Sequence, residues 1–264
     1  MNISACIITF NEEENIRAAC ESVAWADEIV VVDSESTDGT REIAQTCGAR
    51  VLINKWPGFA KQKQFATDAA AHDWILSLDA DERVSPELES SIAGLRRRPD
   101  TSLADGYRLA RRTFYMGRWI RGGGWYPDFQ LRLFNRRHGS WGDRLIHESF
   151  AMKSGSRVET LSGDLLHHTV RDAAHHQQMI EERYAPLGAQ QMFREGKRTS
   201  SLQAAVAGPS AFVRSYILKS GFRDGSAGLM IAKFAARHAS LKHKLLLELQ
   251  TTGQKPDREG GHEA

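Results

Sequence analysis

Strand-like and helix-like segments alternate four times in the first ninety residues, and this alternation limits the possible folds more than any other feature of the sequence. Short runs rich in apolar residues, separated by helical patterns, indicate a parallel sheet whose two faces are both covered. Ligands of such sheets bind beyond the carboxyl ends of the strands. We therefore expect an α/β fold with a mostly parallel sheet, and strands at residues 3–9, 28–32, 50–53 and 74–78.

Helices are expected between these strands, and their ends carry recognisable signals. Asn11 is placed to cap the first helix and Thr40 to cap the second. Gly48 stands where a glycine commonly ends a helix. A third helix is expected over residues 59–71, and a fourth begins after Ser85, with a proline at its first position.

Three carboxylates follow the fourth strand, at Asp79, Asp81 and Glu82. If the chain is still extended there, residues i and i+2 point the same way, so Asp79 and Asp81 would aim at one spot. Adjacent carboxylates raise each other's pKa unless a cation lies between them, and a divalent metal that holds a diphosphate suits such oxygen ligands. A solvated acidic turn is the alternative, because Asp-x-Asp is a short and common pattern.

Polar residues at the ends of three strands favour the metal site over the solvated turn. Thr9 and Asn11 follow the first strand, Asp33 follows the second, and the acidic pair follows the fourth. Because the carboxyl ends of parallel strands meet at one edge, these side chains should collect there. The sequence therefore predicts a metal and nucleotide site at this edge.

No glycine-rich dinucleotide motif or P-loop occurs in the sequence, so a phosphate must be held in another way. A metal on Asp81 would hold it. Lys63, on the third expected helix, could add a cation at the same edge. A surface position for Lys63 fits the helical pattern at least as well.

The composition is that of a protein with one large domain and a possible appendage, at 264 residues and 41% apolar residues. Cys6, Cys20 and Cys47 form no C-x-x-C pair, which argues against a disulfide framework or zinc site and for a reducing compartment. The apolar run at residues 3–10 lacks a basic leader and reads as a strand, and no stretch approaches the length of a membrane span.

Charge is distributed unevenly along the chain. Residues 1–90 hold 7 Lys and Arg against 17 Asp and Glu, whereas residues 91–264 hold 28 against 16. The acidic part can hold a metal, and the basic part can meet an anionic partner. Mutual neutralisation of the two parts is the simpler alternative.

The second part begins with expected strands at residues 105–112, 113–120 and 128–134, with Met116-Gly117 as a turn. Residues 96–137 carry 11 bases and 3 acids, which suits a phosphorylated ligand. Trp125, Asp128 and Arg132 are our candidates for contacting that ligand. We expect one of four neighbouring aromatic side chains to touch a sugar, although tryptophans are more often in the core: Trp119, Trp125, Tyr126 and Trp141.

Helices are expected at residues 173–195 and 209–249, followed by a disordered tail at 251–264. Residues 209–244 carry seven bases and one acid among apolar faces. Such a segment could lie on an anionic membrane surface or pack on the core with a solvated basic face, and the two readings are equally supported. The domain division we expect is 1–170, made of halves 1–90 and 91–170, then a helical extension at 171–250.

Three motifs in the first part resemble those of the inverting family 2 glycosyltransferases of GT-A fold: Thr9-Phe10-Asn11-Glu12-Glu13, Val31-Val32-Asp33-Ser34-Glu35-Ser36-Thr37-Asp38-Gly39-Thr40 and Leu78-Asp79-Ala80-Asp81-Glu82. Later segments, at residues 123–134, 146–148, 165–167 and 216–225, are similar to the bacterial lipopolysaccharide-core glucosyltransferases of that family. The resemblance reaches to about residue 250. It implies a Rossmann-like nucleotide-binding sheet, a small mixed acceptor subdomain and a C-terminal helical extension.

The resemblance also implies a nucleotide-diphosphate sugar donor, usually UDP-linked. Thr9, Asn11, Glu12 and Asp33 would then line the nucleoside, with Asp79 near the ribose and diphosphate. The family pattern further places the second aspartate of the motif on Mg²⁺ or Mn²⁺. One departure is that a glutamate stands at position 35, where a small residue, often glycine, is more usual.

An inverting transfer needs one base near the acceptor hydroxyl, and a carboxylate or a histidine can act as that base. By the family pattern Glu148 fits best, with His147 orienting it, and Asp128 is the rival base. An ordinary surface ion pair is the alternative role of Glu148. The pattern also places His167 where a further metal ligand could reach the diphosphate, since neutral imidazole suits Mn²⁺.

The function that the resemblance implies is transfer of glucose from UDP-glucose to a sugar of a lipopolysaccharide core or another surface glycan. The expected location is the cytoplasm, with possible contact to the anionic inner membrane. A sugar-nucleotide nucleotidyltransferase, a basic RNA-binding module and an enzyme acting on a lipid-phosphate carrier are the alternatives. We expect no nucleic acid partner, and the last alternative would need membrane-embedded helices.

Overall fold

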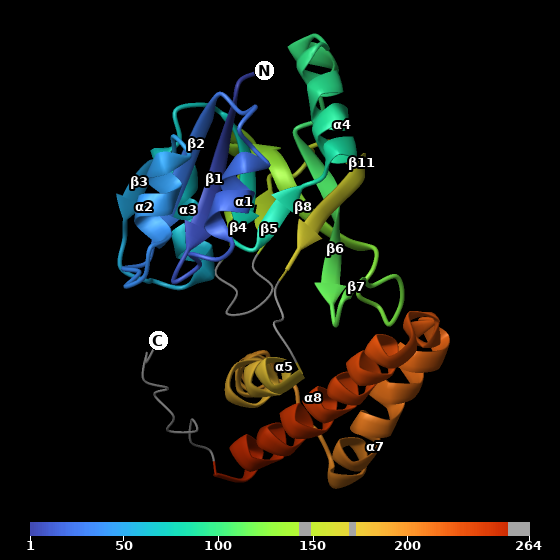
Figure 1. Cartoon of the computed structure of the whole chain (residues 1–264). Coiled ribbons are helices and arrows are strands. Elements are labelled where there is room, and N and C mark those ends of the chain that lie inside the picture. The colour runs from blue at the N-terminus through green and yellow to red at the C-terminus, as the bar shows by residue number, and fades with distance from the viewer. Residues whose placement is uncertain (143–148, 169–172, 253–264) are drawn as a thin grey trace. The chain divides into compact units, whose positions relative to one another are not determined.

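A computed structural model gives the fold and describes residues 1–142, 149–168 and 173–252 (Figure 1). The chain forms two compact units. The first contains residues 1–112 and 128–167, and the second contains residues 113–127 and the chain after residue 167. Residues 113–127, which we expected in the acceptor half of the first domain, therefore group with the second unit.

The first unit is built on one mixed sheet with the strand order β3-β2-β1-β4-β8-β6-β11-β5. The first four are mutually parallel, and β8 pairs with β4 and β6 in antiparallel fashion. The strands are β1 Ile3–Thr9, β2 Glu28–Asp33, β3 Arg50–Ile53, β4 Trp74–Asp79, β5 Glu82–Val84, β6 Gly106–Tyr115, β8 Asp128–Asn135 and β11 Val158–His167. The expected parallel strands are thus confirmed to within a residue.

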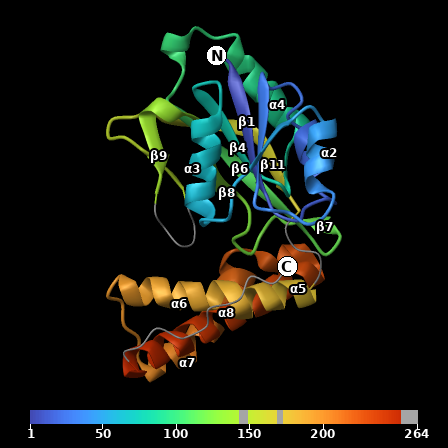
Figure 2. The same ribbon diagram turned by 90° about the vertical axis from the view of Figure 1, so that its left-hand side faces the viewer.

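Side chains of β1 alternate between two hydrophobic cores, which is why both faces of the sheet carry helices. On one face, Ile3 and Ile7 pack in the core that is covered by α1, α2 and α4. On the other face, Cys6 and Ile8 pack in the core that is covered by α3. Figure 2 shows α3 on the opposite side of β1 and β4 from α2 and α4. The helices are α1 Ile16–Glu21, α2 Thr40–Thr46, α3 Phe59–Ala69 and α4 Pro86–Arg96.

The sheet curls back on itself between β4 and β5. Only Ala80 and Asp81 connect these two strands, yet β8, β6 and β11 separate them in the order of the sheet. The sheet can have this strand order and this short connection only if it bends round into a partly closed barrel. This curl brings β11, the antiparallel partner of β5, to the carboxyl end of β4.

Two of the predicted helix ends are confirmed. Ser85 caps α4 by accepting a hydrogen bond from Leu88 N, and a proline follows it as expected. Gly48 follows α2 with a φ of 80°, a left-handed conformation that glycine adopts without steric cost.

Two predicted caps are wrong. Asn11 does not cap α1, which begins only at Ile16. Its backbone takes a φ of 51°, and its Oδ1 accepts a hydrogen bond from Thr37 N (2.8 Å), so it joins two loops. Thr40 is the first residue of α2 rather than its cap, and its Oγ1 accepts a hydrogen bond from Glu12 N (2.8 Å). Both side chains connect the loops after β1 and β2 in place of capping a helix.

The second unit combines a strand hairpin with a helical bundle. Met116 and Gly117 form the turn between the end of β6 and β7 (Arg118–Trp119), as predicted, and both have positive φ. The two strands expected at 105–112 and 113–120 differ from this, because β6 continues unbroken to Tyr115.

A buried carboxylate ties the hairpin to the helices. Asp224 is fully buried and accepts hydrogen bonds from the backbone N–H groups of Arg121 and Gly122. These bonds satisfy two donors of the chain after β7, and they fix that chain to the turn before α8.

The helices of the bundle are α5 Ala173–Gln178, α6 Ala185–Arg194, α7 Ser201–Val213 and α8 Gly225–Thr252. Met179–Tyr184 and Arg214–Leu218 are π-helical segments that continue α5 and α7, and Gly221–Asp224 is a short 3₁₀ helix. The expected start of a helix at residue 209 is wrong. A capping box between Ser200 and Gln203 begins α7 earlier, and Pro209 lies inside it.

The apolar residues of α8 are internal to the bundle, as Ile231 and Phe234 show. The helix includes residues 251 and 252, which we expected in the tail, and the rest of that tail lies outside the described residues. Within the described part of the chain, no helix combines the length and the apolar character that crossing a membrane requires.

Candidate nucleotide-sugar site

The loops after β1 and β2 are locked together by short polar side chains. Asp33 is fully buried, and it accepts hydrogen bonds from Ser36 N (2.9 Å) and from the Ser36 hydroxyl. The same hydroxyl accepts a hydrogen bond from Asn11 N (2.8 Å). Glu35 has a φ of 66°, a left-handed conformation that glycine adopts at no steric cost. The loop therefore keeps the shape that a small residue would favour.

Thr9 is the first group at this edge with unused bonding capacity. Its Oγ1 is buried and has no hydrogen-bond partner among the residues that the structure describes. A buried hydroxyl without a partner is costly, so a ligand that bonds to it would recover that free energy. Glu12, by contrast, is held locally, since its Oε2 accepts a hydrogen bond from Asn15 Nδ2 (2.8 Å).

Two cations hold the carboxylate of Asp79. Lys63, only 1% exposed, places its Nζ 2.9 Å from Oδ1, and Arg132 places Nη2 2.8 Å from Oδ2. Burial alone would raise the pKa of Asp79, but the ammonium and the guanidinium outweigh it and hold that pKa well below its usual range. Lys63 is therefore not a surface lysine. Arg132, which we expected at the acceptor, contacts the same carboxylate, and its acceptor role stays a prediction.

Glu82 lies at the centre of this network, and the sequence motif alone assigned it no role. It is fully buried; its Oε2 accepts a hydrogen bond from Asp79 N (3.0 Å) and its Oε1 from Arg132 (2.8 Å). Arg111 lies 3.4 Å from the same Oε1. The available signal was its position on the strand after the acidic turn, between Ala80 and Val84, which are both buried.

Asp81 faces His167 and not the two cations that hold Asp79. Asp81 Oδ2 lies 3.3 Å from His167 Nε2, beside the paired strands β5 and β11. The expectation that the chain stays extended through this motif is wrong, because Ala80 and Asp81 form a turn. Burial acts to raise the pKa of Asp81, but His167 outweighs it and the pKa is lowered. The two aspartates thus have different partners.

The donor set at this turn fits a hard divalent cation that also binds phosphate. The described residues contain no group of three or more His, Cys, Asp and Glu side chains placed to hold a metal. Mg²⁺ usually takes one or two protein ligands and completes its shell with water and substrate phosphates. Asp81 and His167 are close enough together, and both remain partly exposed, to serve as such a pair.

The expected base falls in a segment that the structure does not describe. His147 and Glu148 lie outside the described residues, within 143–148. The strands on either side are β9 (Gly139–Trp141) and β10 (Phe150–Met152), and their aromatic residues are buried. The ring of Trp141 lies 5.4 Å from Lys63 Nζ. The described residue Trp141 thus lies near the cation that contacts Asp79.

Both carboxylate oxygens of Asp128, the rival base, accept hydrogen bonds from neighbouring side chains. Arg111 donates to Oδ2 from Nε (2.9 Å) and Nη2 (2.7 Å), and Gln130 donates to Oδ1 (2.7 Å). Both oxygens are thus already engaged with neighbouring side chains. The role of Asp128 as the base stays a prediction.

The candidate sugar-binding tryptophans are used at least in part for packing. Trp141 is buried against Phe134 and Phe150 in the first unit. In the second unit Trp119 packs on Phe114, and Trp125 packs on Tyr115 and His176. An acceptor role for Trp125 stays a prediction.

Comparison with known proteins adds a family match and several relatives. The model of the family described as Glycosyl transferase family 2 matches residues 4–156. The lipopolysaccharide core biosynthesis glycosyltransferase LpsC of Rhizobium meliloti (strain 1021) is 32% identical over 251 residues, which cover 90% of this chain and 89% of that protein. An uncharacterized glycosyltransferase of Rickettsia felis is 30% identical, with coverage of 92% and 90%.

Solved structures with some likeness include TarS of S. aureus in complex with UDP, at 15% identity and a TM-score of 0.48, covering 96% of this chain and 92% of that chain. Glucosyl-3-phosphoglycerate synthase from Mycobacterium tuberculosis, in complex with Mg²⁺ and UDP, is 25% identical with a TM-score of 0.35 and covers 44% of each chain.

Proposed function

This chain belongs to glycosyl transferase family 2 and has the GT-A fold, and from that premise we propose that it transfers glucose from UDP-glucose, with inversion, to a sugar of a lipopolysaccharide core. The acceptor is supported by the similarity to LpsC of Rhizobium meliloti, which is named for lipopolysaccharide core biosynthesis and matches over most of both chains. The glucosyl group follows from the motif resemblance in the sequence.

The observation that carries the proposal is the arrangement of charge at the carboxyl edge of the sheet. Buried Lys63 and Arg132 neutralise Asp79, while Asp81 and His167 face each other one turn away. A nucleoside diphosphate carries negative charge that needs cations, and a site with buried cations beside two metal-binding side chains supplies them. The nucleoside would lie over Thr9, whose hydroxyl has unused bonding capacity.

Asp81 and His167 are the residues that would hold Mg²⁺ or Mn²⁺. When bound, such an ion stabilises the negative charge that develops on the departing diphosphate. Lys63 and Arg132 stand on the same edge and oppose the repulsion between Asp79 and that diphosphate. These two side chains thus contribute to the reaction by placing positive charge where the leaving diphosphate forms.

Glu148 is the base that we propose, with His147 orienting it. The carboxylate takes the proton of the acceptor hydroxyl, the acceptor oxygen forms the new bond to C1 of the sugar, and the bond from C1 to the diphosphate oxygen breaks. Attack from the side opposite the leaving group inverts C1. The engagement of both oxygens of Asp128 by Arg111 and Gln130 supports Glu148 over its rival.

The acceptor that we propose is joined to a lipid, which would bring the enzyme to the cytoplasmic face of the inner membrane. A soluble core oligosaccharide without its lipid should still accept the sugar, because the transfer chemistry involves the sugar alone. This separates the chemistry from the location and allows each to be tested alone.

The test is release of UDP and transfer of sugar to core oligosaccharide, measured with Mn²⁺ over a panel of UDP-sugars. UDP-glucose should give the largest kcat/KM, and Asp81→Asn should abolish transfer, whereas the surface change Asp68→Asn on α3 should not. Transfer by Asp81→Asn at the wild-type rate would contradict the metal role, and formation of UTP and sugar 1-phosphate from the UDP-sugar when pyrophosphate is added would indicate a nucleotidyltransferase.

The two candidate bases can be separated in the same assay. Glu148→Gln should lower kcat by about 10²–10⁴-fold, the usual contribution of a positioned general base. Asp128→Asn should retain more activity, because it removes a partner of Arg111 and no proton acceptor. The opposite order would move the role of base to Asp128.

A further inference from the structure

Helix α7 is apolar on two opposite faces, and only one of them is packed. Gly208 is buried against α8, where a Cβ at its position would come within 2.2 Å of Ser240 Oγ. On the opposite side, Leu202, Val206 and Val213 recur at helical spacing and are 74%, 47% and 44% exposed. A helix that is hydrophobic all round is normally buried, so this exposed face calls for a partner.

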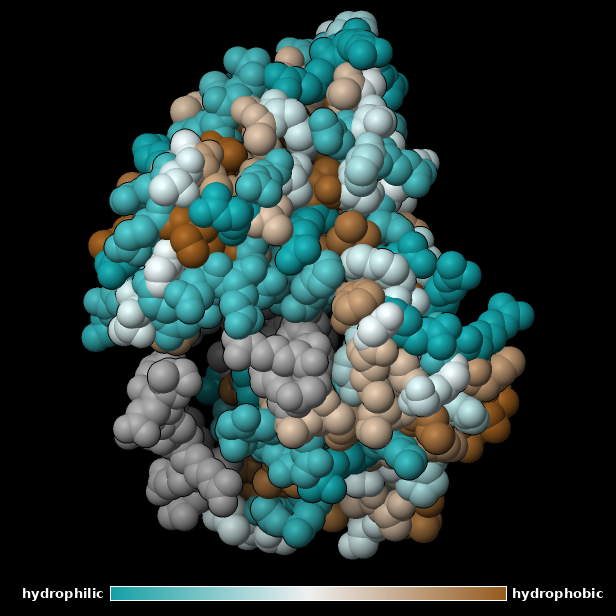
Figure 3. All heavy atoms as spheres, viewed as in Figure 1, coloured by the Kyte–Doolittle hydropathy of each residue, from teal (hydrophilic) through white to brown (hydrophobic). Residues whose placement is uncertain are grey.

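The exposed row continues past the end of α7 into the π-helical segment Arg214–Leu218 and the 3₁₀ helix Gly221–Asp224. Ile217 is 57%, Leu218 74% and Phe222 52% exposed. In Figure 3, hydrophobic spheres gather at the lower right, where α7 and the short helical segments after it lie in Figure 1. We call the α7 face the surface formed by these six side chains: Leu202, Val206, Val213, Ile217, Leu218 and Phe222.

The chain segment that carries the α7 face is basic, and its first base, Lys197, is paired with Glu195. Residues 197–223 contain five bases and no Asp or Glu. Among the bases, Arg214, Lys219 and Arg223 are exposed and interleave with the end of the apolar row. The next acid along the chain, Asp224, is fully buried and bonded to the hairpin backbone, so it does not offset them.

We propose that the α7 face docks on an anionic lipid surface, with the helix lying in the plane of the interface. Apolar side chains on one side and bases beside them are the features that hold a helix at a membrane surface. Each base near an anionic leaflet adds to the attraction. The site differs from the basic segment expected from the sequence, because the apolar residues of α8 are internal and unavailable.

A second copy of the chain fits this surface less well than a membrane does. In a two-fold dimer the same patch meets itself, so the bases of one face would lie against those of the other. Like charges brought together in this way oppose association. An anionic leaflet has the complementary sign, and it also receives the apolar row.

The proposal deepens the proposed function, whose acceptor is lipid-linked, but membrane binding requires neither donor nor acceptor. The test is flotation of the full chain with vesicles made of equal parts phosphatidylglycerol and phosphatidylethanolamine, compared with phosphatidylcholine vesicles. The wild-type chain should float with the anionic vesicles, and salt should weaken its binding.

The apolar contribution is tested with a matched pair of substitutions. Ile217→Asp should lower vesicle binding by about 10-fold or more, because it removes an apolar side chain from the lipid interface and adds a negative charge there. Ile53→Asp is the control, since Ile53 is similarly exposed, at 59%, on β3 of the other unit. Both isoleucines are exposed, so neither change should prevent folding, and circular dichroism melting would check this.

The charge contribution is tested with two triple variants of equal net charge. Arg214→Gln/Lys219→Gln/Arg223→Gln should lose binding to anionic vesicles, whereas Arg17→Gln/Lys61→Gln/Arg97→Gln should retain it. The proposal is overturned if the wild-type chain does not float, or if the α7-face variants float as well as their controls. It is also overturned if Ile217→Asp abolishes a concentration-dependent dimer in place of vesicle binding.

Failure of this proposal and failure of the proposed function give different results. UDP release with a lipid-free oligosaccharide should be unchanged in Ile217→Asp, because the α7 face takes no part in the chemistry. A chain that floats but releases no UDP would contradict the function alone. A chain that transfers sugar but does not float would contradict the docking surface alone.

Discussion

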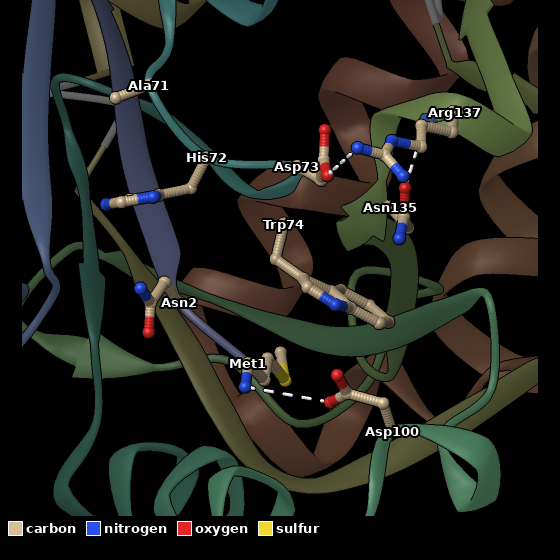
Figure 4. A pocket seen from close by; sticks show the side chains of 9 residues that line it. All are labelled: Met1, Asn2, Ala71, His72, Asp73, Trp74, Asp100, Asn135 and Arg137. Carbon is tan, nitrogen blue, oxygen red and sulfur yellow. Dashed lines mark hydrogen bonds and ion pairs between the residues drawn. The ribbon is translucent and has the colours of Figure 1, made fainter.

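The amino and carboxyl ends of strands β1 and β4 differ in how deeply their charged side chains are buried. At the amino end lies a hollow of about 460 Å³ (Figure 4), lined by Met1, Asn2, Ala71, His72, Asp73, Trp74, Asp100, Asn135 and Arg137. Its ion pairs are open to water, since Arg137 is 73% and Asp100 79% exposed. At the carboxyl end, Lys63 and Glu82 are almost wholly buried within one network.

The contrast supports the carboxyl end, with its buried charges, over the open hollow as the proposed donor site. Exposed ion pairs are weak and cost little to form, so they occur without any functional reason. Buried charges carry a large desolvation penalty and persist only where partners compensate them. Such charges cluster at functional sites because they set the potential that a ligand meets.

The largest difference between the two ends should appear in stability. Glu82→Gln should destabilise the protein by up to about 3–5 kcal/mol, because the guanidinium groups of Arg111 and Arg132 each lose one of their two carboxylate partners. Asp73→Asn, at the amino end, should cost less than about 1 kcal/mol. Urea unfolding measures both, and equal losses would remove the distinction between the ends.

A smaller difference is expected in donor binding. Lys63→Met should raise the KM for the sugar nucleotide by about 10–100-fold, because Asp79 loses a charge-assisted partner and repels the diphosphate. Asp100→Asn should change this KM by less than about twofold, as expected for an exposed site away from the ligand. Steady-state kinetics at saturating acceptor would measure the KM for the sugar nucleotide in both variants. An unchanged KM in the lysine variant would remove Lys63 from the donor site.

The smallest effect concerns Glu28, at the amino end of β2. Burial acts to raise the pKa of its carboxyl, but bonds from Ser4 Oγ and Ala71 N and the Arg50 guanidinium outweigh burial and lower that pKa. A depressed folded-state pKa stabilises the fold above the unfolded value of about 4.3 and loses that effect as the pH falls through the folded value.

The melting-temperature gap between wild type and Glu28→Gln should therefore be constant near neutral pH and close below about pH 4. Thermal melts monitored by circular dichroism across that range provide the measurement. A gap that widens on acidification would show that some other group determines the effect. A gap that closes below about pH 4 would show that the amino end also holds a carboxyl group whose pKa is lowered.

The sequence predicted the parallel strands well because each is a short apolar run, and buried strands tolerate little else. The resemblance to family 2 glycosyltransferases is confirmed by the family match, and it followed from motifs at those same strand ends. Thr9, Asp33 and Asp79 do lie at the ends of their strands, because parallel strands bring these positions to one edge.

The partners of these residues were not predictable in the same way. Whether Lys63 is buried depends on Trp141 and Asp79, which are distant in the sequence. The role of Glu82 depends on the curl that places β8 and β6 around it, and no local pattern encodes that curl. The early start of α7 was missed because Pro209 was read as a helix start, although the bundle accommodates it inside the helix.

The pairing of β5 with β11 has a consequence for how the enzyme is made. The acidic turn is synthesised early, but His167, the partner of Asp81, leaves the ribosome only after residues 83–166. Contacts between residues so distant in sequence form late in folding, since a long loop must close first. A fragment that ends before β11 would contain every residue of the nucleotide motifs and yet lack the closed turn that they serve.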